Sequence, residues 1–187
     1  HDNGDSKTKD YSMKMGYDWL DVGSEPTDWW PWMYNRWIFP KHRFIMWIIA
    51  HKRILTGARM KHMNMTTTGL CCICDDELEN IDHLFSGCRF SRRIFNEIGA
   101  WCGILLPEKD CISWWLRVRE RSATKKKFVG IILATSIYTI WHVRNVAKFD
   151  FFVSTQEKVT RRIKNDVIRR VDSLDLSTDC MNTRNWI

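Results

Sequence analysis

The stretch that decides the fold is residues 71–88, CCICDDELENIDHLFSGC, where four cysteines and one histidine stand close together. Cys71, Cys74, His83 and Cys88 have the spacing C-x2-C-x8-H-x4-C. Two thiolates three positions apart can both face inward across a tight turn, and a His and a Cys five apart can do so from the end of a short helix. Three thiolates and one imidazole form a closed tetrahedral shell, which suits one structural Zn²⁺ and leaves no position for a catalytic water. The spacing therefore predicts a zinc knuckle held by these four side chains.

The other cysteines are expected to be free thiols, because chains without secretory features rarely use cysteine in disulfides. Cys72 could replace Cys71 as a ligand, but C-x-C is a poorer chelating turn. A small buried or partly exposed thiol is the favoured role for it. Cys102, Cys111 and Cys180 lie far away in the sequence and are expected to be buried apolar side chains.

The composition of the 187-residue chain is that of a folded domain. Hydrophobic residues make up 44% of it, and eleven tryptophans stand against nine glycines and four prolines, which excludes collagen-like and low-complexity classes. The longest weakly polar run, residues 128–141, is shorter than the ~20 residues of a membrane span, and the N-terminus lacks the apolar stretch of a signal peptide. We expect an intracellular protein, nuclear or cytoplasmic and not secreted, that neither associates with a membrane nor acts on a small-molecule substrate.

Helical periodicity dominates the chain, and no stretch alternates with period two. Helices are expected near residues 12–20 and 31–37, from Pro40 to about residue 55, over 79–85 to deliver His83, from Ser91 to the stop at Gly103, after Asp110, over 123–147, and from a capping box of Ser154 and Glu157 onward. The helix at 123–147 is apolar around most of its circumference, which is typical of the central helix of a bundle. The predicted fold is all-α, a helical assembly with an inserted Cys3His zinc knuckle and little or no β-sheet.

This pattern divides the chain into four predicted parts. Residues 1–30 form an acidic segment with a short helix, and residues 31–106 form the zinc-binding domain, with its knuckle at 71–88. Residues 107–176 form C-terminal helices that pack on that domain, and residues 177–187 form a tail.

Charge is distributed in blocks, and the formal net charge is +7. Residues 31–70 hold seven basic side chains and no acidic one, whereas residues 71–88 hold five carboxylates and no Lys or Arg. An acidic knuckle repels phosphate, so a polyanion is expected on the basic surfaces beside it. The candidate nucleic-acid-binding residues are Lys41, Arg43, Lys52, Arg53, Arg59 and Lys61 on one side, and Arg161, Arg162, Lys164, Arg169 and Arg170 on the last helix. Trp29, Trp30 and Trp32 could stack on unpaired bases, although aromatic residues at helical spacing more often belong to a core.

Several segments, in order, resemble the zinc-binding domain that follows the reverse transcriptase in plant non-LTR (LINE-type) retrotransposons. Residues 11–17, YSMKMGY, are similar to its S-x-K-x-x-Y helix, and Trp37 with 40–47, PKHRFIMW, is similar to its W…P-K-x-x-F-x-x-W segment. Residues 55–60, LTGARM, stand where the family has L-T-x-x-R-L.

The zinc segment and a later helix extend the resemblance. The knuckle is similar to the family's C-x-x-C…E-T…H-L-F…C signature, and residues 140–145, IWHVRN, with Phe149 resemble its I-W-x-x-R-N…F helix. Asp75, Asn80 and Phe95 depart from the family pattern, but none of them replaces a metal ligand. These departures fit a decayed or domesticated copy as well as an active element.

The resemblance implies a nucleic-acid-binding accessory domain and not a polymerase. A polymerase needs a palm with three metal-binding carboxylates, and the nearest candidate, residues 73–76, fails because Cys74 is assigned to zinc. A Mg²⁺-dependent nuclease on the acidic cluster is disfavoured, since Mg²⁺ sites usually take one or two carboxylates. A solvated acidic loop is the better account of its five carboxylates, Asp75, Asp76, Glu77, Glu79 and Asp82.

Two hypotheses remain for the function. The first is an RNA-binding module, with DNA at a target site as a second ligand and the upstream reverse transcriptase region as a partner. The second is a domesticated zinc-stabilised protein-interaction or structural domain.

Overall fold

The computed structural model describes residues 36–103 and 123–174. Its elements are, in order, α3 (Pro40–Ala50), α4 (Gly57–His62), the π-helical turn η1 (His83–Gly87), α5 (Arg89–Cys102), α7 (Ala123–Phe149) and α8 (Gln156–Asp172). Within these two ranges the β-structure consists of one isolated antiparallel bridge between Leu70 and Leu78. The prediction of an all-α fold is confirmed. None of the helices in these ranges combines the length and the apolar character needed to cross a membrane.

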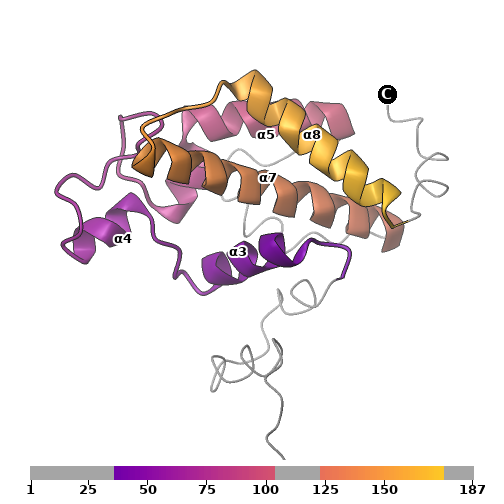
Figure 1. Ribbon diagram of the computed structural model, residues 1–187, viewed down its shortest axis with the longest axis horizontal. Helices are drawn as coiled ribbons and strands as arrows, with labels where there is room; N and C mark the ends of the chain where they lie inside the picture. Colours follow the sequence, from indigo (N-terminus) through magenta and orange to yellow (C-terminus); the bar gives the residue numbers. More distant parts are fainter. Residues whose placement is uncertain (1–35, 104–122, 175–187) are drawn as a thin grey trace, which may run out of the picture.

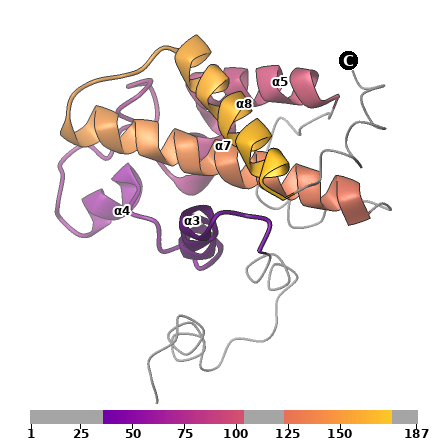
Figure 2. The same ribbon diagram turned by 45° about the vertical axis from the view of Figure 1, so that its right-hand side comes forward.

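Helix α7 runs through the middle of the molecule, with α3 along one side and α5 and α8 along the other (Figure 1). The turned view in Figure 2 keeps this order. The middle of α7 is almost completely buried, since the exposed fraction is at most 1% for each of Ile131, Leu133, Ala134, Ile137 and Ile140. A helix covered on several sides must be apolar around most of its circumference. The sequence pattern of this helix is therefore explained by its central place.

Helix α3 begins at Pro40, as expected for a proline in the first turn, but it buries a different face from the predicted one. The helical spacing of Phe44, Trp47, Ile48, His51 and Leu55 predicts that these residues share the core-facing side. Phe44 is instead 44% exposed, and His42, Met46 and Ile49 are buried with Trp47. The prediction for Phe44 was wrong because the helix is apolar on several sides. Its periodicity therefore does not select one face, and packing against α7 selects it instead.

Two helix starts also differ from the predicted caps. Helix α5 begins at Arg89 with Cys88 at its N-cap position, and Ser91 is buried inside the first turn. Helix α8 is capped by Thr155, whose hydroxyl accepts from the backbone N–H of Lys158 at 3.4 Å, so the predicted Ser154 cap is off by one residue. The stop of α5 at Gly103 is confirmed by its left-handed φ of 64°. Neighbouring Ser and Thr residues compete for the same cap, and tertiary position decides between them.

The predicted zinc-binding segment and the predicted C-terminal helices share one hydrophobic core, which includes Ile38, Phe85, Ile98, Ile140 and Ile163. On α8, helical spacing predicts one core-facing side of Val159, Ile163, Val167, Val171 and Leu174; the first four are buried and Leu174 is partly buried. The predicted parts at 1–30 and 177–187, the helices expected near 12–20 and after Asp110, most of the one at 31–37, and Cys111 and Cys180 lie outside the described residues.

Candidate metal centre

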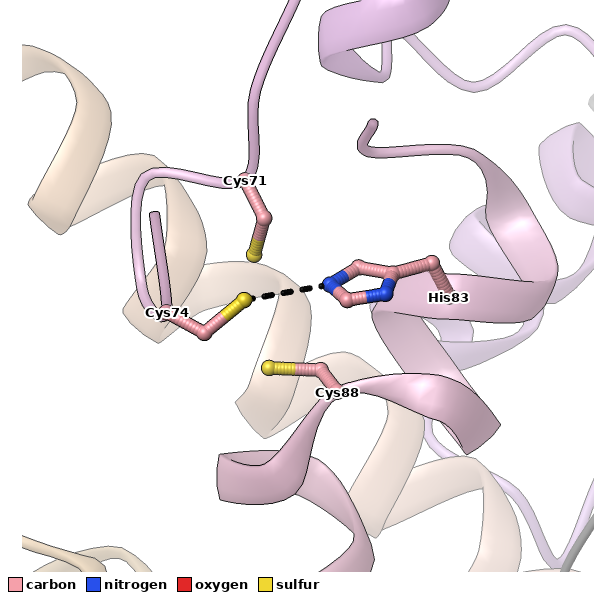
Figure 3. A group of neighbouring side chains, drawn as sticks. All are labelled: Cys71, Cys74, His83 and Cys88. Carbon is pink, nitrogen blue, oxygen red and sulfur yellow. Dashed lines mark hydrogen bonds between the residues drawn. The ribbon is translucent and has the colours of Figure 1, made fainter. Parts of the chain in front are cut away.

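The structure brings the side chains of Cys71, Cys74, His83 and Cys88 together in one buried cluster (Figure 3). Their three sulfurs and the imidazole all lie within 4.8 Å of one another, and Cys74 Sγ is 3.3 Å from His83 Nε2. Ligand atoms of a tetrahedral site with Zn–S distances of ~2.3 Å are roughly 3.8 Å apart. The donor set and its spacing therefore fit one Zn²⁺ with little rearrangement. The zinc cofactor predicted from the sequence is confirmed at this level.

Short local structures deliver the four side chains. The backbone N–H of Asp75 donates to the carbonyl of Cys71 at 2.8 Å, which closes the turn between the first two cysteines. Asp75 completes this turn with a left-handed φ of 56°, a conformation that aspartate tolerates better than most residues. The turn of η1 then places His83 and Cys88 side by side, with the Cys88 N–H donating to the His83 carbonyl at 2.6 Å. A single wide turn thus supplies the second pair of ligands.

The histidine of the cluster is oriented by a carboxylate that sequence reasoning assigned to a solvated acidic loop. His83 Nδ1 lies 3.1 Å from Glu77 Oε2, so this nitrogen donates a hydrogen bond to the carboxylate, while Nε2 is the ring nitrogen that faces Cys74. Metal-binding histidines commonly donate their second ring nitrogen to such a partner, which fixes the tautomer. The only sequence signal for Glu77 is its place between the second Cys and the His.

The thiols of Cys71 and Cys88 perturb each other. Their hydrogen bond, with burial adding to it, raises the pKa of Cys71, and the same hydrogen bond lowers the pKa of Cys88. The two sulfurs thus lie within hydrogen-bonding reach of each other. Cys102, outside the cluster, is buried as predicted, and burial raises its pKa to about 12.

A buried ion pair joins the knuckle to the central helix. Glu79 and Arg144 are 0% and 1% exposed, and Arg144 donates to both carboxylate oxygens, at 2.6 to 3.1 Å. Glu79 Oε1 also accepts from the backbone N–H of Gly57 at 2.7 Å, which ties the start of α4 to the same point. Assigning Glu79 to a solvated acidic loop was therefore wrong. The signal that could have found it is Arg144, the single Lys, Arg, Asp or Glu between Lys127 and Lys148, since a lone charge in such a helix requires a buried partner.

Cys72 points away from the metal cluster. Its thiol lies 3.5 Å from the carbonyl of Arg144 and 3.9 Å from Glu79 Oε2, and burial raises its pKa to about 11. It is the partly exposed thiol that the sequence favoured, and the neighbouring ion pair covers the rest of it.

The basic residues predicted on α3 and α4 separate into two groups. Lys41 and Arg43 lie in the first turn of α3, where the Lys41 ammonium is 5.0 Å from the ring centre of Tyr138 on α7. Lys52, Arg53, Arg59 and Lys61 follow the end of α3 and continue into α4, and all four are exposed. Arg59 donates to the carbonyl of Lys52 at 3.0 Å, and Lys52 has a left-handed φ of 54°.

The basic residues predicted on α8 lie on two flanks of that helix. Arg170 donates to the carbonyls of Trp37 and Arg36 and covers the ring of Phe39 at 4.5 Å, so it fastens α8 to the start of α3. Lys164 lies over the ring of Trp101 on α5, at 5.6 Å, on the opposite flank. Arg161, Arg162 and Arg169 are exposed, and Asp166 pairs with Arg162 at 3.9 Å and Arg169 at 4.0 Å. The five residues thus do not form one strip.

Comparison with known proteins supports the reading of the zinc cluster. Residues 11–95 match a family model described as zinc-binding in reverse transcriptase. No curated protein and no solved structure matches the chain significantly. The matched range includes all four cluster residues, Cys71, Cys74, His83 and Cys88, as well as the buried Glu79. Over residues 11–95 the chain is thus similar to the zinc-binding domains found in reverse transcriptases.

Proposed function

We propose that the chain is a non-catalytic nucleic-acid-binding accessory domain of a non-LTR retrotransposon reverse transcriptase, stabilised by one zinc ion on Cys71, Cys74, His83 and Cys88. The plant LINE-type resemblance of the motifs supports this setting, and the family match describes an accessory zinc-binding domain, distinct from the catalytic part of the enzyme. In this proposal RNA is the main ligand, with target-site DNA as a second one. The upstream reverse transcriptase region is the protein partner, and the setting is nuclear or cytoplasmic.

The observation that carries the RNA proposal is the concentration of cations where α3 and α8 flank α7. The pKa of the buried His42 is lowered to about 4 by burial, and further by the charges of Lys41, Arg170 and Arg162. Three cations from two helices thus act on one point, and one of them, Arg162, also pairs with Asp166 at 3.9 Å. Such a field attracts phosphate. We call the surface of Lys41, Arg43 and Arg162 the α3/α8 basic surface.

A second basic group lies beyond the end of α3. Lys52, Arg53 and Lys61 form no ion pair with a carboxylate in the described part of the chain, and residues 36–74 contain no Asp or Glu. In this proposal the phosphates of one RNA strand run from the first turn of α3 toward α4.

A salt titration tests the proposal. Each phosphate contact with single-stranded RNA contributes about −0.7 to the slope of log affinity against log salt. Replacing Lys41 and Arg162 by Gln removes two cations and keeps helix propensity. The slope should become shallower by about 1.4 if both make contact. The loss should be nearly uniform across RNA sequences, because phosphate contacts carry little base information.

The matched control removes two charges from another surface. Arg92 and Arg93 are exposed on α5, so Arg92→Gln with Arg93→Gln changes the net charge equally without touching the α3/α8 basic surface. This control should leave the slope unchanged. An equal effect of both double variants would mean that net charge alone drives binding, and an unaltered slope in the Lys41/Arg162 variant would remove this surface as the RNA site.

A protein-interaction role is the second candidate, and a specific observation favours it. Phe149, Phe151 and Phe152, at the end of α7, are 59%, 91% and 57% exposed. Exposed apolar patches mark interaction surfaces. If the native protein binds RNA without any salt dependence, or does not bind it, this candidate takes precedence.

A further inference from the structure

A hollow of about 310 Å³ lies between α3 and the second half of α7. Its walls include Tyr138, Trp141, His142 and Phe149 of α7, and Ile45 of α3 closes one side. Trp141, His142, Asn145 and Phe149 follow Tyr138 by 3, 4, 7 and 11 residues, which is the spacing of one stripe along a helix. The volume is at the lower end of the ~300–1,000 Å³ range of small-molecule sites. It suits a planar group of the size of a nucleobase.

Charge is graded along this hollow. At the Tyr138 end, the Lys41 ammonium lies 5.0 Å from the ring centre of Tyr138, and Lys41 and Arg162 both act on His142. At the Phe149 end, the wall includes the carboxylate of Asp150. A phosphate is therefore attracted to one end and repelled from the other. A base, which carries no charge and can offer amino groups to a carboxylate, fits the acidic end.

The walls also offer a hydrogen-bond donor to a base edge. Asn145 lines the hollow, and its Oδ1 accepts from Arg144 Nη1 at 3.0 Å. The amide nitrogen of Asn145 therefore remains as the donor on that side chain. The pKa of His142 is lowered by burial and by the charges of Arg162 and Lys41, so its ring is neutral at neutral pH and adds a flat apolar surface.

We propose that this hollow is a stacking site for one unpaired base of single-stranded RNA, whose adjoining phosphates lie on Lys41 and Arg162. The proposal rests on the proposed RNA-binding function and adds the part of the ligand that its cations cannot recognise. Aromatic side chains beside a basic track are how sequence-tolerant single-strand binders hold bases. The tryptophans first considered for stacking, Trp29, Trp30 and Trp32, lie outside the described residues.

Phe149 is the residue to test, because it is 59% exposed and its removal leaves the core intact. Loss of one stacked base weakens binding by about 5- to 160-fold. Phe149→Ala should therefore weaken binding of a short single-stranded RNA by this factor. It should leave the affinity for an abasic oligomer of the same length unchanged. Its salt slope should equal that of the native protein, whereas the Lys41/Arg162 variant changes the slope.

The matched control is Phe151→Ala, since Phe151 is 91% exposed and is not part of the hollow. It should bind both oligomers like the native protein. A fluorescent 2-aminopurine base in the RNA gives a second measurement: its emission should be quenched by the native protein and by Phe151→Ala, and not by Phe149→Ala.

Three results would overturn the stacking site. One is an equal loss of affinity for the normal and the abasic oligomers, another is an equal loss in the Phe151 variant, and the third is quenching that survives Phe149→Ala. The salt slope tests the phosphate contacts separately. If the native protein shows the expected slope and any of these three results is found, the stacking site is refuted and the RNA-binding function stands.

Discussion

Breaking the buried pair of Glu79 and Arg144 should destabilise the whole domain. In Glu79→Gln the side chain keeps its shape and can still accept from Gly57 N–H, but the Arg144 guanidinium, 1% exposed, loses its counter-charge. In Arg144→Met the converse holds, and the Glu79 carboxylate, 0% exposed, is left alone. Removing one partner of a buried pair costs about 3–5 kcal/mol. That is a large share of the ~5–15 kcal/mol by which domains are stable.

The contacts of Glu79 and Arg144 narrow the expected loss in the free energy of unfolding. Arg144 makes three hydrogen bonds to the carboxylate, and its other donors reach Asn145 Oδ1 and Met60 Sδ. Glu79→Gln retains a neutral acceptor for some of these bonds, so its cost should lie toward 3 kcal/mol, while Arg144→Met should lie toward 5 kcal/mol. The double variant leaves no buried charge, and its loss should be clearly smaller than the sum of the two single losses.

Urea unfolding followed by circular dichroism, at saturating zinc, measures these free energies. The control is Glu97→Gln, which breaks the exposed pair with Arg93 at 3.7 Å and should cost less than about 1 kcal/mol. Single-variant losses below about 1 kcal/mol, or strictly additive losses in the double variant, would refute the reasoning that this pair is a desolvated, coupled unit.

Three further predictions concern the metal centre and the core. Cys74→Ala should abolish stoichiometric zinc binding, measured by elemental analysis, and should speed amide exchange across residues 71–88, whereas Cys102→Ala should leave the metal content unchanged. Glu77→Gln should weaken zinc binding by about 10-fold or more in a chelator competition because it frees the His83 tautomer, and Asp75→Asn, which alters the exposed turn alone, should not. Burial lowers the pKa of His42 from 6.5 to about 4, so the stability that depends on its neutral ring is complete above pH 6.5 and is lost as the pH falls toward 4. Over this pH range, at fixed zinc, the free energy of unfolding should fall by about 3 kcal/mol more in the native protein than in His42→Gln. Parallel pH profiles of the two proteins would contradict this prediction.

Local sequence pattern was sufficient to predict the metal ligands and the main helices. The intervals between Cys71, Cys74, His83 and Cys88 are short, so turn geometry alone brings each pair together, and contacts between the two pairs complete the cluster. Helix α7 was predictable because an apolar stretch of that length can be satisfied only in the centre of a helical assembly. The left-handed stop at Gly103 followed equally from local backbone chemistry.

Positions that depend on which helix lies next to which were not predictable. Phe44 is exposed and His42 buried because the approach of α7 selects one face of an apolar helix. The five basic residues of α8 divide between two flanks because α3 takes one flank, through Arg170, and α5 takes the other, through Trp101.

The sequence by itself determined the all-helical class, the four-residue zinc cluster and the block of positive charge without carboxylates at residues 36–74. Each of these depends on residues near one another in the chain, where covalent connectivity sets the geometry. Only the tertiary structure decided that Glu79 is buried on Arg144, 65 residues away, and that the stripe on α7 opens as a hollow beside Lys41 and Arg162. The physical reason is that burial and electrostatic fields are set by neighbours in space, and these neighbours come from helices far apart in the sequence.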